Sequence, residues 1–117
     1  MKKISLLFLI TFFLISSFTI VFADRNTATI TTYNSSQLIK RGDAKIYSIT
    51  FVATSSNGFF VIQDALSQTL GMTDTKAEGA EATSGNSQFQ NFVDKPLEFS
   101  TGLYLCISNG YVILRYE

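Results

Sequence analysis

The chain has 117 residues, with 9 acidic and 9 basic side chains and therefore no formal net charge. This balance does not favour binding to nucleic acid or to an anionic membrane surface, because both need clustered Lys and Arg. The chain has no His, and Cys106 is its single Cys, so zinc sites of Cys and His, His-based catalytic pairs and an internal disulfide are excluded.

The first 23 residues have the pattern of an export signal. Lys2 and Lys3 precede an uncharged run, rich in Leu, Ile and Phe, that begins at Ile4 and ends at Ala23. This pattern predicts cleavage after Ala23 and a secreted, periplasmic or cell-surface protein. An uncleaved membrane anchor is the alternative, because an uncharged and mostly apolar run of 20 residues can span a bilayer as a helix. We expect membrane contact only through residues 1–23, if they are retained.

The remaining residues, 24–117, are expected to form one domain. Loss of Lys2 and Lys3 leaves 7 basic and 9 acidic residues, a small negative charge. A domain of this size buries only about 60 to 65% of its unfolded surface. We therefore expect a homo-oligomer, or another protein partner, to add stability.

The first half of this domain predicts strands. Residues 27–33 are mostly β-branched, which favours a strand, and residues 34–36 form a turn. A short segment, 37–40, leads to a polar corner at 41–43. Residues 45–53 alternate, which predicts a strand whose apolar face carries Tyr47, Ile49, Phe51 and Ala53.

Asn57 and Gly58 follow as a hairpin signal. Asn-Gly suits a type I′ turn, whose twist matches the strands that it joins. With these two residues as the loop, Ala53 faces Ile62 and Ser55 faces Phe60.

The middle of the domain has weaker signals. Asp64 could cap a short helix over residues 64–72, which Gly71 would end. Residues 73–90 are mainly small and polar and include Gly79 and Gly85. Because such a segment buries little apolar surface, we expect a long mobile loop at about 73–90.

The end of the chain predicts two short strands, 89–93 and 97–99, on either side of a corner at Pro96. A second Asn-Gly hairpin joins strands 102–108 and 111–117. In this hairpin Ile107 faces Val112, Leu105 faces Leu114 and Leu103 faces Tyr116, and these six residues are the expected principal core. The opposite surface is too apolar for a solvated face, so it is the candidate interaction face: Tyr104, Cys106, Tyr111, Ile113 and Arg115.

These elements predict an all-β fold, an antiparallel β-sandwich or jelly-roll-like domain after an N-terminal signal helix. The acidic residues are mostly of the type that caps turns, so we expect no catalytic site, no metal and no cofactor. Asp64 and Asp74 are the candidate ligands for a calcium ion, but no spaced Asp-x-Asp motif supports such a site. Cys106 is expected to fill the core, with an intermolecular disulfide as the alternative.

Arg41-Gly42-Asp43 spells the tripeptide that some adhesive proteins present to integrins, with a tight polar turn as the simpler interpretation. Residues 96–99 and 102–104, the Asn109-Gly110 pair and residues 112–116 resemble the end of small β-sandwich virion proteins of tailed phages. The hairpin from Ala44 to Asp64 resembles the middle of the same proteins. This resemblance implies a decoration or fibre-type structural role, often as an oligomer, although such proteins normally have no export signal.

The sequence thus favours a secreted or surface-associated structural or interaction module that is not an enzyme and that self-associates or is virion-like. The alternative is a small-ligand or carbohydrate-binding domain, in which aromatic rings serve as stacking platforms. Four residues are candidates for that role: Tyr33, Tyr47, Tyr104 and Tyr111. Tyrosines gathered around a concave pocket would favour ligand binding, whereas a flat apolar patch would favour association.

Overall fold

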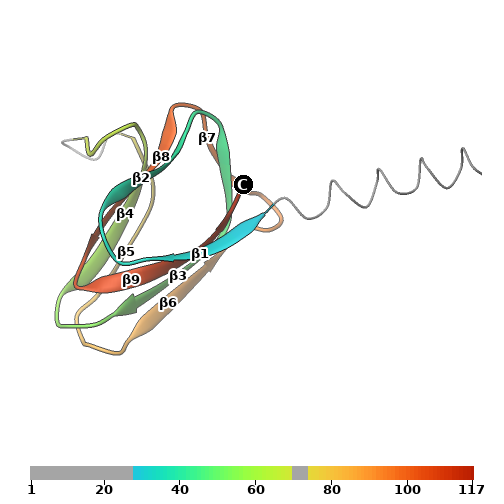
Figure 1. Cartoon of the computed structure of the whole chain (residues 1–117). Coiled ribbons are helices and arrows are strands. Elements are labelled where there is room, and N and C mark those ends of the chain that lie inside the picture. Colours follow the sequence, from blue (N-terminus) through green and yellow to red (C-terminus); the bar gives the residue numbers. More distant parts are fainter. Residues whose placement is uncertain (1–27, 70–73) are drawn as a thin grey trace, which may run out of the picture.

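The computed structural model describes residues 28–69 and 74–117, which form nine β-strands and no helix (Figure 1). In chain order they are β1 (Thr29–Tyr33), β2 (Gln37–Arg41), β3 (Ala44–Ala53), β4 (Gly58–Asp64), β5 (Thr75–Glu81), β6 (Ser87–Asn91), β7 (Leu97–Phe99), β8 (Gly102–Ser108) and β9 (Gly110–Tyr116). The predicted export segment, residues 1–23, lies outside the described residues. Within the described ranges, no helix is long and apolar enough to cross a membrane.

All strand pairs are antiparallel and form two sheets that pack face to face (Figure 1). Sheet A has the order β1-β9-β3-β6, and β7 pairs with the start of β3. Sheet B has the order β2-β8-β4-β5. Strands β1 to β4 alternate between the two sheets, and β8 and β9 alternate again, which is the winding of a jelly roll. The predicted β-sandwich or jelly-roll-like fold is confirmed.

The core lies between the sheets and consists of side chains at alternate strand positions. Leu103 and Leu105 come from sheet B, Val112 and Leu114 come from sheet A, and all four are fully buried. Ile107 and Tyr116 are partly buried against them. The six residues expected as the principal core are therefore in the core. Phe51 and Phe60 join them from opposite sheets, with ring centroids 5.3 Å apart.

The alternation in β3 changes phase at Tyr47. The register of β3 against β9 shifts between Ile46 and Ser48, as at a β-bulge. Ile49, Phe51 and Ala53 face the core as expected, but before the bulge Ile46 is the fully buried residue. The placement of Tyr47 on the apolar face was therefore wrong, since the extra residue turns its side chain outward.

Neither Asn-Gly pair forms the hairpin that the sequence predicted. β3 and β4 belong to different sheets, and so do β8 and β9. Each Asn adopts the expected positive φ, 58° at Asn57 and 56° at Asn109, but the following Gly does not. A type I′ turn needs positive φ at both positions, so each pair instead carries the chain across from one sheet to the other.

The expected cross-strand pairs are wrong for the same reason. Ala53 pairs with Gly110, and Ile62 pairs with Leu105 and Ala77. Leu114 pairs with Ile49 and Thr31 in sheet A. Residues that were expected to lie side by side within one hairpin therefore meet across the core.

The expected loop at about 73–90 is also wrong for most of its length, because it contains β5 and most of β6. Both are edge strands, so each needs few apolar side chains. Ala77 is the buried residue of β5, and Gly79 leaves room for the ring of Phe60. Residues 65–67 form bends and residues 68–69 are irregular, so the expected helix does not start here, and residues 70–72 lie outside the described part.

Candidate interaction surfaces

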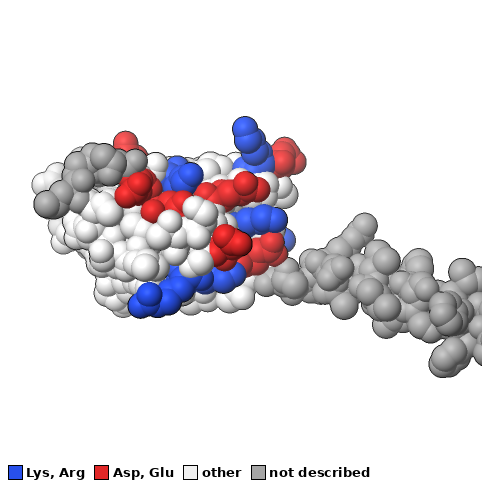
Figure 2. Space-filling model, turned by 90° about the horizontal axis from the view of Figure 1, so that it is seen from above, with Lys and Arg blue, Asp and Glu red and all other residues white. Residues whose placement is uncertain are grey.

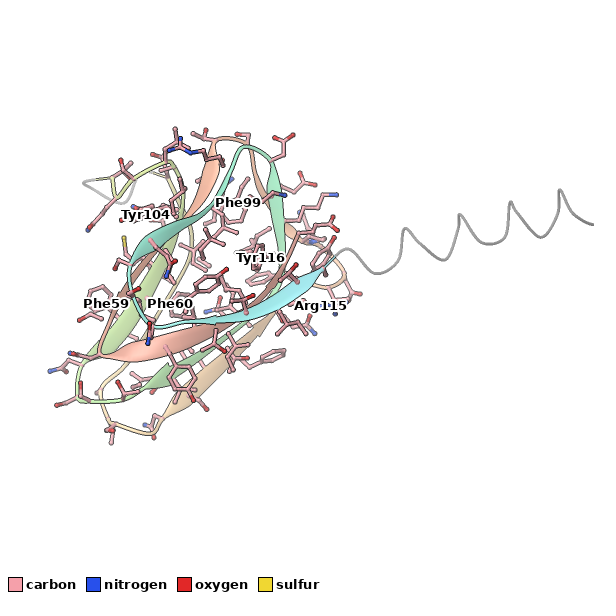
Figure 3. The ribbon with its side chains drawn as sticks, in the orientation of Figure 1. Phe59, Phe60, Phe99, Tyr104, Arg115 and Tyr116 are labelled. Atoms are coloured by element: carbon pink, nitrogen blue, oxygen red, sulfur yellow. The ribbon has the colours of Figure 1, made fainter. Side chains whose placement is uncertain are left out.

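The five residues of the predicted interaction face lie on two different surfaces. Tyr111, Ile113 and Arg115 alternate with buried residues of β9 and face outward from sheet A. Tyr104 and Cys106 occupy the corresponding positions of β8 in sheet B. Figure 3 shows Tyr104 and Arg115 on separate sheets, with Phe60 and Tyr116 directed between them. The expected single face depended on the hairpin that does not form.

The outer face of sheet A has exposed apolar side chains and little charge over most of its area. On β1, β9, β6 and the part of β3 after the bulge, the strand registers place eleven side chains on this face: Ile30, Thr32, Ser48, Thr50, Val52, Ser87, Phe89, Asn91, Tyr111, Ile113 and Arg115. Ile30 and Phe89 lie on its two edge strands and are 69% and 64% exposed. Ile113 and Thr50 lie between them on the central strands. Arg115 is the one charged residue among these eleven, while Lys45 and Glu98 form a charged pair on the same face where β7 pairs with the start of β3.

Arg115 is held at one end of this face by Tyr47. The guanidinium carbon of Arg115 lies 5.6 Å from the centroid of the Tyr47 ring, a distance typical of a cation–π contact. A hydrogen bond to Glu117 raises the pKa of the Tyr47 hydroxyl, as do burial and the negative charge of Glu117, while Arg115 lowers it. The cation thus has an aromatic ring beneath it and a carboxylate nearby.

The four candidate stacking tyrosines do not gather in one place. Tyr33 is directed toward the core side, where its hydroxyl lies 2.7 Å from that of Tyr116. Tyr47 and Tyr111 lie on sheet A, at opposite ends of its outer face, and Tyr104 lies on sheet B. None of the four lines the depression among the charged residues at one end of the sandwich or the one beside β7.

The outer face of sheet B is partly covered by the segment that follows β4. Gln63, which is 2% exposed, exchanges hydrogen bonds with Thr69. Its amide nitrogen lies 2.9 Å from the Thr69 hydroxyl, and the Thr69 N–H donates to its amide oxygen at 3.2 Å. This exchange fixes residues 65–69 over the sheet.

Cys106 lies beside Gln63 on this covered face. Its thiol is free, it is 7% exposed, and its sulfur is 3.9 Å from the Gln63 amide oxygen. Burial raises the pKa of the Cys106 thiol. Since a reactive Cys needs exposure and an electropositive setting, this thiol is shielded instead. The thiol lies on the outer side of sheet B, under the segment that follows β4, and not in the core between the two sheets as expected.

Charged side chains gather at one end of the sandwich (Figure 2). They surround an open depression of about 810 Å³. Its charged lining residues are Lys40, Asp43, Lys45, Asp64, Lys76, Glu98 and Glu117. Lys45 and Glu117 approach to 3.8 Å. Because both signs are interspersed, the depression presents no single-sign field for a charged ligand.

Asp64 at this end has a structural role. Its carboxylate accepts backbone N–H bonds from Ser100, Thr101 and Gly102, the shortest of 2.8 Å from Thr101. Burial raises the pKa of Asp64, but these N–H donors outweigh burial and hold the pKa below its ordinary value. The carboxylate therefore fastens the chain before β8 to the end of β4, instead of capping a helix.

Arg41-Gly42-Asp43 connects β2 to β3. β2 ends at Arg41, β3 begins at Ala44, and Gly42 has a φ of 74°. The Gly42 N–H donates to the Thr101 carbonyl at 2.9 Å. Within residues 28–69 and 74–117, no three acidic, His or Cys side chains stand together as a metal site.

Comparison of the chain with protein-family models, with curated proteins and with solved structures found no match in any of the three. Ile30 and Phe89 were not among the residues predicted to form an interaction surface. A signal for both was present, because each lies at an outward position of a strand in which its neighbours are small or polar. Its use required knowing which strands lie at the edges of sheet A.

Proposed function

We propose that the chain is a secreted or surface-associated structural or interaction module, without enzymatic activity, that binds a protein partner through the outer face of sheet A. The observation that carries this proposal is the exposure of Ile30 and Phe89 on the part of this face after the β3 bulge, where Arg115 is the one charged side chain. Contiguous exposed apolar surface on a small protein favours an interaction site, whereas single exposed apolar residues need no explanation.

A structural role of the decoration or fibre type is the form that we favour. The jelly-roll winding is shared by viral capsid domains, lectins and other proteins, so the fold alone supports no single function. The apolar residues of this face line neither of the depressions described above, which favours a protein partner, because small ligands bind in concave sites. The carboxylate of Asp64 is engaged by backbone donors, which leaves it without the free position that acid–base chemistry requires.

The test compares two equivalent substitutions on opposite faces. Phe89→Ser removes an exposed ring from sheet A, and Phe59→Ser removes an exposed ring from the outer face of sheet B. Tagged protein from the full-length gene is fractionated by size from the cells that produce it. We expect wild type and Phe59→Ser to co-sediment with a larger assembly. The amount of Phe89→Ser in that assembly should be about tenfold lower than for wild type. Equal behaviour of the two variants would refute the choice of face.

A further inference from the structure

The longer edge strands of the sandwich, β1, β2, β5 and β6, differ in how they are protected against pairing with another chain. Edge strands are usually blocked by charges, bulges or covering groups, because their free N–H and C=O groups can bind another strand. β2 carries Lys40 and Arg41, and its register shifts between Leu38 and Lys40. A second copy along β2 would therefore meet a bulge and like charges.

The edges of β5 and β6 face each other and are bridged by hydrogen bonds from side chains of β6 to backbone carbonyl groups of β5. The Gln88 amide donates to the Ala80 carbonyl at 2.7 Å, and the Gln90 amide donates to the Glu78 carbonyl at 3.1 Å. Side chains of β6 thus occupy carbonyl groups of β5. Glu78 and Glu81 also stand on this side, where a second copy would bring like charges together.

β1 has none of these devices within the described residues. It contains Thr29, Ile30, Thr31, Thr32 and Tyr33, with no charge, no Pro and no register shift, and it pairs with β9 alone. Its outward-facing residues, Ile30 and Thr32, are exposed. In Figure 1, β1 and β2 diverge from the turn that joins them, so β2 does not lie along β1.

The geometry points to antiparallel pairing of β1 with β1 of a second copy, which would join two copies of sheet A into one continuous sheet. This inference goes beyond the proposed function, because it adds a contact with a second copy at the edge of sheet A. A two-fold axis at Thr31 pairs all five residues of each strand and sets Ile30 opposite Thr32 of the other copy. No like charges meet there, because β1 has no charged residue.

The size of this contact predicts weak association. A single pair of five-residue strands is below the roughly 1,200 Å² of total buried area that is typical of stable complexes. We therefore expect a monomer–dimer equilibrium that is detectable at concentrations up to about 1 mM.

The test uses charge swaps at the two exposed outward positions of β1. Ile30→Lys/Thr32→Lys places Lys opposite Lys twice, and Ile30→Glu/Thr32→Glu does the same with Glu. Directly opposed like charges destabilise a strand pair, whereas opposite charges stabilise it. By sedimentation equilibrium of protein from the full-length gene, each variant alone should dimerise at least about tenfold more weakly than wild type. An equimolar mixture of the two should restore the dimer.

Ser87→Lys/Asn91→Lys is the matched control, because it adds the same charges to exposed outward positions on the opposite edge strand, β6. It should dimerise like wild type. Circular dichroism melting confirms that each variant is folded. A wild type that stays monomeric, or a mixture that does not recover, would overturn the inference.

The edge and the face can fail separately. A monomeric wild type whose larger assembly still depends on Phe89 would end the β1 pairing and leave the proposed function standing. A dimer that responds to the charge swaps, with an assembly that is unaffected by Phe89→Ser, would support the pairing and refute the face.

Discussion

Gly58 and the carbonyl oxygen of Asn109 meet where the two Asn-Gly connections lie side by side. A Cβ at position 58 would stand 2.8 Å from that oxygen, 3.0 Å from the Ala53 Cβ and 3.1 Å from the Phe51 ring. Gly110 is equally confined, since its Cβ would lie 2.6 Å from the same ring. Both glycines therefore serve close packing, while the positive φ falls on the Asn before each of them.

Gly58→Ala should destabilise the fold by about 1 to 3 kcal/mol, because backbone has to move to admit the methyl group. The measurement is the free energy of unfolding in urea. Ser56→Ala, an exposed change in the same connection, should stay within about 0.5 kcal/mol of wild type. An unchanged Gly58→Ala would show that the two connections are not packed as described.

The sequence predicted which residues are buried better than it predicted which strands pair. The period of two in residues 103–107 and 112–116 identifies Leu103, Leu105, Val112 and Leu114 as inward-facing, whether their partners lie in the same sheet or across the core. The position of β9 between β1 and β3 depends on long-range contacts that no local pattern contains. An Asn with positive φ can start a hairpin or a crossing between sheets, so the turn signal could not distinguish them.

The predictions of a loop at 73–90 and of a single interaction face were wrong for related reasons. β5 and β6 carry few apolar residues, because an edge strand is completed by backbone pairing and by the amides of Gln88 and Gln90. Tyr111, Ile113 and Arg115 were correctly placed together, since they share one strand. Tyr104 and Cys106 were added to them only through the hairpin, and they lie on the other sheet.

The hydrogen bond between the Tyr33 and Tyr116 hydroxyls predicts alkaline sensitivity. Burial and this bond raise the pKa of Tyr33 to about 12. Because the folded value is above the ordinary value of 10.0, the contribution of Tyr33 to stability is complete below about pH 10 and is lost as the pH rises through about 12. The free energy of unfolding should fall over that interval.

Tyr33→Phe should flatten this decrease, and Tyr111→Phe, on the outer face, should retain it. The check is urea unfolding at a series of alkaline pH values, together with absorbance titration of tyrosinate. If Tyr33→Phe loses stability with pH as steeply as wild type, the alkaline transition has another origin.

Asp64 predicts the opposite dependence at acid pH. Its pKa in the folded chain lies below the ordinary value of 3.8, so its contribution is present above that pH and is lost as the pH falls through the folded value. Asp64→Asn should be less stable by about 1 kcal/mol at neutral pH, because a neutral amide oxygen accepts the three N–H bonds more weakly. It should also lose part of the acid dependence of unfolding. Asp43→Asn, in the exposed turn at the same end, is the control and should preserve both properties.

Cys106 should react slowly in the folded protein. Its sulfur is shielded by its neighbours on sheet B, and burial disfavours the thiolate that attacks an alkylating reagent. We expect alkylation to be at least about tenfold slower in native buffer than in urea. Ser87→Cys in a Cys106→Ala background presents an exposed thiol on the other sheet and should react at the same rate in both conditions.

Purified native protein should migrate as a monomer on a non-reducing denaturing gel, since a buried thiol cannot reach another copy. A covalent dimer in that lane would show that the cover over Cys106 opens, and it would restore the intermolecular disulfide as the explanation of this Cys.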